Sequence, residues 1–227
     1  MSQPFAVVFD LAGPIIMDRG IGLPGLLARL LADGGESDPL AHLPLDQRGN
    51  IFLGSDLFGI GPAVEYRVSY VRSLRPTAMA TDIALHEKRN RAALDQITLR
   101  DERKNLLDSR RATGAEILVA FGAGDPERVE SLLSDLGHIG AKRSSGYGAI
   151  KAVRLLPIDH PHAGLADRDG NPMRPVPVAL WRGMNLPPRP VRNLVAGLPR
   201  WAAPREPCVG PLEWVMETEG LQRELAA

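Results

Sequence analysis

The alternation of apolar and polar positions divides the first part of the chain into short elements. An apolar, β-rich run over 5–12 predicts a strand, and a partly alternating run over 64–72 predicts a half-buried strand. Leucines at helical spacing over 23–31, with Pro24 in the first turn, predict a helix. Short strands are expected within 51–58, where apolar residues flank a Gly-Ser pair.

A strand, a helix and a second strand are predicted further along the chain. The run 115–121 predicts a strand, and Asp125 followed by Pro126 is typical of a helix N-terminus. The run 147–156 predicts the second strand. The helix and this last strand are joined by a loop over 137–148 that is rich in glycine and basic residues.

Residues 157–211 differ from the rest because they contain twelve prolines. Proline removes a backbone donor and interrupts helices, so we expect short helices, extended segments and turns there. All three tryptophans lie in the last quarter of the chain and can anchor it to a folded body. The pattern predicts a domain over 1–156 and a Pro/Trp-rich C-terminal extension over 157–227 packed on it.

The composition is that of an ordinary soluble globular protein, with 27 basic and 27 acidic residues. No apolar run approaches the roughly 18 to 20 residues that a membrane helix needs, and the N-terminus has no basic region of a secretory signal. Cys208 is the only cysteine, which excludes an internal disulfide and a thiolate zinc site. These features predict a cytoplasmic protein.

The charges are clustered, although their sum is zero. Residues 67–112 hold eleven bases and six acids, residues 138–154 hold four bases and no acid, and residues 170–205 hold six arginines and no acid. Folding can gather such clusters on one face, where arginine binds phosphate and stacks on bases. Residues 82–112 have no wide apolar stripe, so we expect an extended basic arm. A nucleic-acid partner is therefore favoured.

The loop carries the most specific chemistry in the sequence. Glycines let a backbone bend sharply and let a ligand approach the amides, while cations attract phosphate and a tyrosine can stack on a base. The loop follows a helix and precedes a strand, which is the reverse of the order in a nucleotide P-loop. Three glycines, Gly140, Gly146 and Gly148, enclose the polar side chains of the loop. These are Lys142, Arg143, Ser144, Ser145 and Tyr147.

Residues 139–150 resemble the glycine-rich signature of the RAMP superfamily of CRISPR-associated proteins. The resemblance implies an α+β fold: a ferredoxin-like (RRM-type) domain over 1–156 with a basic arm inserted at 77–112, and a Pro-rich, irregular C-terminal segment. Within the superfamily the chain is most similar to the subunit that caps the 5′ handle of the guide RNA (crRNA) in class 1 effector complexes of type IV.

That resemblance implies a non-catalytic crRNA-binding subunit of a ribonucleoprotein in antiviral defence. Its partners would be the crRNA, a RAMP backbone subunit and a large subunit, with target DNA met indirectly and no membrane, cofactor or metal involved. We expect the loop and the arm to contact the RNA through Lys142, Arg143, Ser144, Ser145, Gly146, Tyr147, Arg72, Arg75, His86, Lys88, Arg89 and Arg91.

Two other functions stay open. A metal-independent endoribonuclease that processes repeat RNA needs a positioned general base, for which the candidates are His42, His86, His138, His160 and His162. Of these, the last two resemble a metal-binding pair only weakly. Alternatively, a ferredoxin-like domain can use the glycine loop to bind a small phosphate ligand. RNA that copurifies with the protein distinguishes the guide-RNA subunit and the endoribonuclease from the phosphate-ligand domain.

Overall fold

The computed structural model describes residues 3–16, 21–60, 64–73, 105–141, 143–200, 202–211, 215–216 and 218–225. The chain divides into two compact units, which are described separately below. One unit consists of Met1–Glu65 with Ala112–Ala227, and the other of Tyr66–Arg111.

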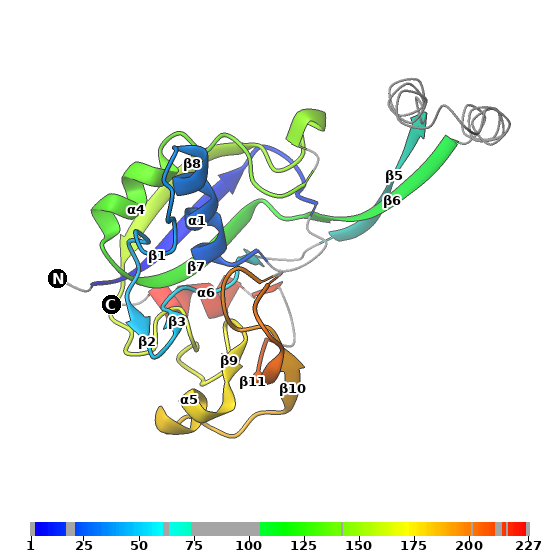
Figure 1. Cartoon of the computed structure of the whole chain (residues 1–227). Coiled ribbons are helices and arrows are strands. Elements are labelled where there is room, and N and C mark those ends of the chain that lie inside the picture. Colours follow the sequence, from blue (N-terminus) through cyan, green and yellow to red (C-terminus); the bar gives the residue numbers. More distant parts are fainter. Residues whose placement is uncertain are drawn as a thin grey trace, which may run out of the picture. The chain divides into compact units, whose positions relative to one another are not determined.

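A five-stranded sheet forms the centre of the first unit (Figure 1). The N-terminal strand of the chain pairs antiparallel with a neighbour on each side. One edge of the sheet carries the only parallel pairing among its described strands, between residues 58–60 and 215–216. In spatial order the strands are β12 (Val215–Met216), β4 (Phe58–Ile60), β7 (Ile117–Gly124), β1 (Gln3–Leu11) and β8 (Ile150–Pro157).

Two helices, α1 (Leu23–Asp33) and α4 (Pro126–Leu133), share a hydrophobic core with one face of this sheet. Successive strand residues point to opposite faces, so the apolar residues of β1 serve two cores. Phe9 packs with the helices, and its neighbour Val8 belongs to the core on the other face. Both helices were predicted by their apolar spacing, and the structure confirms them.

The start of α4 follows directly from its sequence. The Asp125 carboxylate accepts a hydrogen bond from the Arg128 backbone N–H at 3.1 Å, as an N-cap residue does. Pro126 occupies the first turn, where its missing N–H leaves no helical hydrogen bond unmade. The predicted N-terminus of this helix is therefore confirmed.

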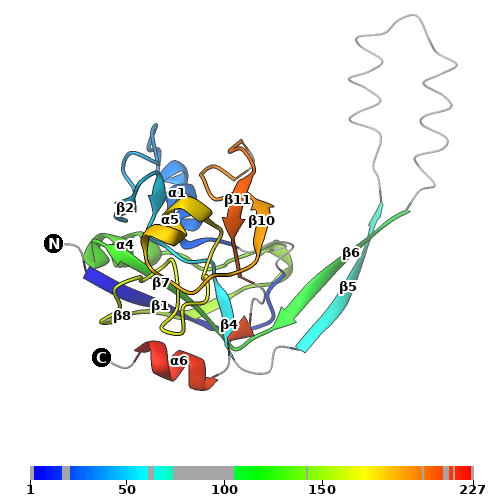
Figure 2. The same cartoon turned by 90° about the horizontal axis from the view of Figure 1, so that it is seen from below.

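The second face of the sheet is covered by the C-terminal part of the chain. Ile158, Ala163 and Met173 pack there with Leu221 of α6 (Thr218–Leu225). Figure 2 shows α6 on the side of the sheet opposite α1. The C-terminal part thus packs on the sheet, as a continuous part of the same compact unit.

A third core lies within the proline-rich region, which has more regular structure than the sequence suggested. Trp181, Met184 and Cys208 are buried together there. The helix of this region spans six residues, and its strands two to four, which agrees with the expected effect of the prolines. The elements are β9 (Val176–Pro177), α5 (Val178–Gly183), β10 (Val191–Leu194) and β11 (Glu206–Val209), with strand order β10-β11-β9. A separate antiparallel pair consists of β2 (Gln47–Arg48) and β3 (Ile51–Phe52).

Two long strands, β5 (Val64–Ser73) and β6 (Asn105–Gly114), pair in a two-stranded sheet and account for the described part of the second unit. The strand predicted over 64–72 is confirmed. Of the basic arm expected at 77–112, residues 105–112 belong to β6, and residues 77–104 lie outside the described residues.

The fold belongs to the α+β class, as the sequence predicted. The finer ferredoxin-like assignment stays a prediction. Among the described residues, the helices are too short or too polar to cross a membrane.

Candidate nucleic-acid interface

The glycine loop between α4 and β8 is closed at its base by backbone pairing. His138 and Ala149 form an isolated β-bridge. The Ile139 N–H donates to the Gly148 carbonyl at 2.8 Å, and the Ile150 N–H donates to the Gly137 carbonyl at 2.9 Å. The loop is therefore a closed structure whose two ends run side by side.

The same loop is tied to the segment that follows β1. The Gly148 N–H donates to the Pro14 carbonyl at 2.9 Å, and the Ala141 N–H donates to the Ile16 carbonyl at 3.0 Å. The Ala12 N–H donates to the Ala149 carbonyl at 2.8 Å. Residues 12–16 thus hold the lower part of the loop in place.

The three glycines that enclose the tip of the loop, Gly140, Gly146 and Gly148, have different roles. All three have positive φ, which favours glycine. A Cβ on Gly148 would lie 1.8 Å from the Ile139 carbonyl oxygen, and a Cβ on Gly140 would lie 2.8 Å from the Ile16 carbonyl oxygen. A Cβ on Gly146 would meet no atom within 4 Å. Gly140 and Gly148 are thus required by packing, whereas the backbone at Gly146 borders open space that a ligand can enter.

The tip of the loop carries the predicted side chains. Arg143–Ser145 form one turn of 3₁₀ helix, which the Gly146 N–H closes by donating to the Arg143 carbonyl at 3.0 Å. Arg143 and Ser145 are exposed, and Tyr147 is half-buried. The structure therefore brings three of the predicted side chains and the open backbone at Gly146 together in one short segment. Ser144 lies within the 3₁₀ turn.

The structure does not test the other predicted contact residues. Arg72 is part of β5 in the second unit, and its side chain, like that of Ser144, is outside the described part. Six predicted residues lie outside the described residues: Lys142, Arg75, His86, Lys88, Arg89 and Arg91.

Further basic residues lie on β8 next to the loop. Lys151 and Arg154 are exposed, and the Arg154 guanidinium lies 3.1 Å from the Asp10 carboxylate, which offsets part of its charge. The field of Arg143 also reaches the C-terminal end of α1. The pKa of Asp33 lies below its ordinary value mainly because Arg29 donates to this carboxylate, and the nearby Arg143 lowers it further.

The sequence did not reveal a groove that runs beside the loop. Its volume is about 950 Å³, and apart from Arg174 its lining comes from three segments far apart in the chain: α1 with its flanks, the first half of the glycine loop, and residues 198–200. All three segments belong to the first unit. Most of the lining is aliphatic, and Arg143 of the loop tip lies at this surface.

Buried charged residues lie beside the wall of the groove that residues 198–200 form. Arg174 donates to the carbonyls of Phe52 at 2.8 Å, Gly54 at 3.1 Å and Ala196 at 2.7 Å. Burial lowers the pKa of Arg174 to about 10. The buried Asp56 forms an ion pair with Arg200, yet its pKa is raised because burial outweighs the attraction of the two arginines. The cluster of arginines at 170–205 therefore includes a structural residue, which charge counting alone does not distinguish.

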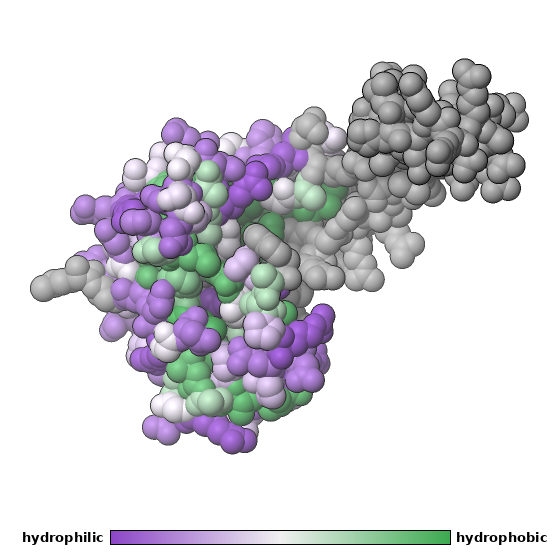
Figure 3. Space-filling view, viewed as in Figure 1, coloured by the Kyte–Doolittle hydropathy of each residue, from purple (hydrophilic) through white to green (hydrophobic). Residues whose placement is uncertain are grey.

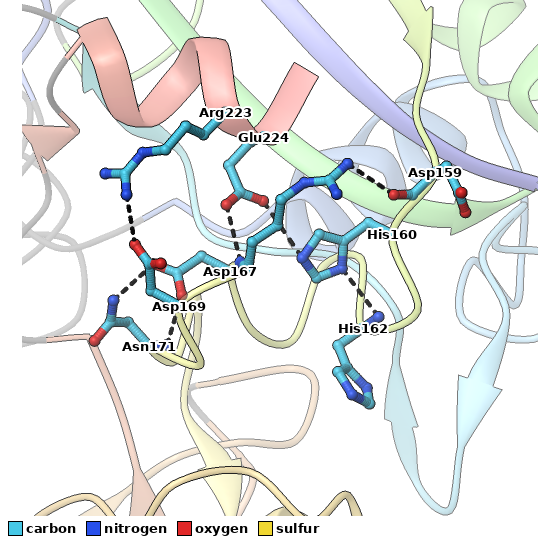
Figure 4. A network of polar contacts seen from close by, with 9 residues as sticks. Asp159, His160, His162, Asp167, Asp169, Asn171, Arg223 and Glu224 are labelled. Carbon is cyan, nitrogen blue, oxygen red and sulfur yellow. Dashed lines mark hydrogen bonds and ion pairs between the residues drawn. The ribbon is translucent and has the colours of Figure 1, made fainter. Parts of the chain in front are cut away.

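The two histidines of the C-terminal part belong to a different polar cluster (Figure 4). The His160 Nδ1 accepts a hydrogen bond from the His162 backbone N–H at 3.0 Å, and its Nε2 lies 3.4 Å from the Glu224 carboxylate. Figure 4 shows the His162 ring directed away from this pair.

This cluster fastens α6 to the loop that follows β8, at residues 159–171. The other Glu224 oxygen accepts from the Arg168 backbone N–H at 2.9 Å, and Arg223 pairs with Asp169 at 3.1 Å. Asp167 accepts two hydrogen bonds from Asn171. Within the described ranges, no three His, Cys, Asp or Glu side chains come together as a metal site would require.

One family model matches the chain, over residues 69–163, and its description is CRISPR type IV associated protein Csf3. The matched region includes β7, α4, the whole glycine loop and β8. No curated protein matches the chain. The match confirms the predicted resemblance: over residues 69–163 this chain is similar to the CRISPR type IV associated protein Csf3.

Proposed function

We propose that this chain is a non-catalytic RNA-binding subunit of a type IV CRISPR effector complex, in which it holds the 5′ handle of the guide RNA. The observation that carries the proposal is the division of roles within the glycine loop. Gly140 and Gly148 are fixed by packing, whereas Arg143, Ser145 and Gly146 lie together at an exposed tip.

A loop of this kind suits a phosphate backbone. The open space at Gly146 lets a sugar–phosphate chain approach the main chain closely. The exposed guanidinium of Arg143 can donate two parallel hydrogen bonds to one phosphate, and the Ser145 hydroxyl adds another donor. Because backbone hydrogen bonds already hold the base of the loop, little conformational entropy is lost when RNA binds there.

The topology supports the ferredoxin-like part of the proposal. With the two-stranded pairs β2–β3 and β5–β6 left aside, the elements follow in the order β1, α1, β4, β7, α4, β8, with β1 and β7 in the middle of these four strands. This is the β-α-β-β-α-β arrangement of split βαβ units. RRM-type domains with this arrangement bind single-stranded RNA.

The proposal that RNA is held rather than cut rests on the side chains at the tip. Arginine is always protonated, and serine and tyrosine have no pKa near neutrality in their ordinary state, so none of them is a ready general base. His138 lies at the base of the loop, where its backbone pairs with Ala149. A subunit that caps the mature 5′ end of the guide also gains nothing from cleaving it.

The guide RNA, a RAMP backbone subunit and a large subunit are the partners that this function requires, and target DNA is reached through the guide. The test starts with the full chain purified without added nuclease. We expect the ratio of its absorbance at 260 nm to that at 280 nm to show that RNA copurifies with it. After RNA removal, repeat RNA incubated with the protein in EDTA or in Mg²⁺ should stay intact.

Two results would overturn this function. Cleavage within the repeat that disappears in His86→Ala or His138→Ala would establish an endoribonuclease. The second result is a protein that carries no RNA and does not bind repeat RNA, but binds inorganic phosphate or a mononucleotide. If Arg143→Ala abolishes that binding, the loop belongs to a phosphate-ligand domain.

A further inference from the structure

The groove beside α1 is a binding surface distinct from the tip of the loop. Its volume of about 950 Å³ lies near the upper end of the range for ligand sites, which is roughly 300 to 1,000 Å³. Figure 3 shows apolar surface between hydrophilic areas on the face that carries α1. Continuous apolar surface bordered by polar residues is typical of interaction sites.

The two sides of α1 explain how the groove arises. Leu23, Leu27 and Leu31 are buried against the sheet. On the side that lines the groove, Gly25, Ala28 and Ala32 follow one another at spacings of three and four residues, which place them on one stripe of the helix. Gly25 and Ala28 are half-buried and Ala32 is exposed, and the larger side chains of Leu26 and Leu30 line the groove beside them.

The walls of the groove are aliphatic and come from both of its sides. Leu198 and Pro199 form one wall, and Leu136 and Ile139 belong to the wall next to the loop. A Cβ built on Gly25 would lie 4.0 Å from the Leu198 side chain, so this wall stands close to the helix. Such a surface buries aliphatic side chains without leaving polar groups unpaired.

Charged side chains lie on both walls of the groove. Arg143 lines it at the loop, while Arg174 and Arg200 line it at the opposite wall. Among the described lining residues, Arg29 and Arg200 pair with Asp33 and Asp56, and Arg174 is buried against three backbone carbonyls. The exposed Arg143 adds a positive charge to these pairs, which favours an acidic group on the occupant.

From this shape and charge, we propose that the groove binds an amphipathic helix of another protein subunit in the effector complex. Its apolar residues would recur at i, i+3 or i+4, and i+7, with acidic residues flanking them toward Arg143 and Arg200. α1 has 11 residues and is thus about 16 Å long, so a partner helix of about three turns matches the groove.

An RNA strand fits this surface less well. Single-stranded RNA needs aromatic side chains for stacking and cations along its whole path. Among the described lining residues the rings are those of prolines and of His138, and the arginines are confined to a few positions. The proposal rests on the proposed function only in requiring a multi-subunit complex, since RNA binding is assigned to the loop tip.

The test places a large side chain in the groove of the full chain. Ala28→Arg is compared with Ala179→Arg, a matched substitution at an exposed position of α5. Each variant is coexpressed with the other subunits of the complex. We expect Ala28→Arg to reduce recovery of a partner subunit at least tenfold, while the isolated variant binds repeat RNA within twofold of wild type. The control should match wild type in both measurements.

Several outcomes would overturn the proposal. If Ala28→Arg weakens RNA binding of the isolated chain tenfold, the groove belongs to the RNA site, and if it changes neither measurement, the groove is not an interface. Loss of RNA binding in every variant and in wild type would refute the proposed function and leave the partner measurement to decide the groove separately.

A second measurement covers the case in which Ala28→Arg does not fold. Ala28→Cys, labelled with a benzophenone maleimide inside the assembled complex, should crosslink to a helical segment with the apolar spacing and acidic flanks given above. A crosslink to RNA or to a segment without these features, or no crosslink at all, would contradict the proposal. Ala179→Cys is the labelling control, and Cys208 is buried.

Discussion

Two parts of the same compact unit are stabilised in different ways. The sheet and the helices α1 and α4 are joined by apolar contacts between regular elements. The proline-rich part depends more on a few buried polar groups: Arg174 connects Ala196 to Phe52 and Gly54, and Glu224 connects α6 to the backbone of Arg168. Because each polar anchor satisfies several groups, a single substitution there should cost more than its contact area suggests.

The largest effect is expected for Arg174→Ala. The change leaves three carbonyls without their donor and removes a positive charge next to the buried Asp56. Removing one member of a buried charged group costs about 3 to 5 kcal/mol, measured as the free energy of unfolding in urea. Arg182→Ala, at an exposed position of α5, should change it by less than about 0.5 kcal/mol. Equal effects of the two would show that Arg174 is not an anchor.

The next effect separates the two kinds of glycine in the loop. Gly148→Ala forces a Cβ against the Ile139 carbonyl, so the loop base must move and the stability loss should exceed that of Gly146→Ala. Gly146→Ala meets no atom and incurs only the cost of a positive φ, about 1 to 2 kcal/mol. Thermal melting measures both. Gly146→Val, which adds bulk at the open position, should weaken RNA binding more than it lowers stability.

The opposite ranking would contradict this division of the loop. If Gly146→Ala destabilises more than Gly148→Ala, the open position is the structural one. If a destabilised Gly146→Val protein still binds RNA normally in its folded fraction, Gly146 has no role in binding.

A smaller loss is expected at the start of α4. Asp125→Ala removes the hydrogen bond to the Arg128 backbone N–H and should lower the free energy of unfolding by about 1 kcal/mol. Ser131→Ala, at an exposed position of the same helix, should be nearly neutral. A loss of several kcal/mol for Asp125→Ala would mean that this end of the sheet unit also depends on a polar anchor.

The change with the least structural effect is Glu224→Gln, which keeps the shape and an acceptor for the Arg168 N–H. Burial raises the pKa of Glu224 above its value of about 4.5 in the unfolded chain. Between these two pKa values the native state binds more protons than the unfolded state, so this group's contribution falls as the pH rises. We therefore expect the variant to match wild type near pH 4 and to be more stable than wild type near pH 8.

The pair with His160 provides the alternative outcome. Burial lowers the pKa of His160, so its own contribution has the opposite slope and is lost on acidification below about 6.5. The His160 contribution is present in wild type and in Glu224→Gln. The difference between their free energies of unfolding at each pH therefore reports the contribution of Glu224. A variant less stable than wild type at pH 8 would mean that the ionised Glu224 stabilises α6 through His160.

Sequence alone predicted the parts of the fold that follow apolar periodicity. β1 and β7 were found because each is a continuous apolar run, which is buried along almost its whole length. α1 was found because its leucines repeat every three to four residues, and α4 because Asp125 and Pro126 mark its start. The proline-rich part lacks such a period, and its sheet depends on contacts between distant segments, such as the pairing of β11 with β9. Its order could not be predicted from local pattern.

The candidate site was predicted as a segment but not in its internal roles. The spacing of cations and glycines located the loop, whereas the difference between Gly146 and Gly148 depends on atoms of Ile139 and residues 14–16. The small residues of α1 were visible in the sequence, but the walls of the groove come from residues more than 90 positions away. Arg174 counted as a free base until its three carbonyl partners were seen.

The salt dependence of RNA binding tests the central claim most directly. The double variant Lys142→Ala/Arg143→Ala is compared with Arg182→Ala/Arg192→Ala, which removes the same charge from exposed positions of the proline-rich part. Affinity for 5′-handle RNA is measured by fluorescence anisotropy between 50 and 300 mM salt, a range that we choose to span roughly physiological ionic strength. If the loop neutralises two phosphates, the slope of log affinity against log salt should decrease by about 1.4 in the loop variant only. An unchanged slope in the loop variant, or an equal decrease in both variants, would contradict the assignment of RNA binding to the glycine loop.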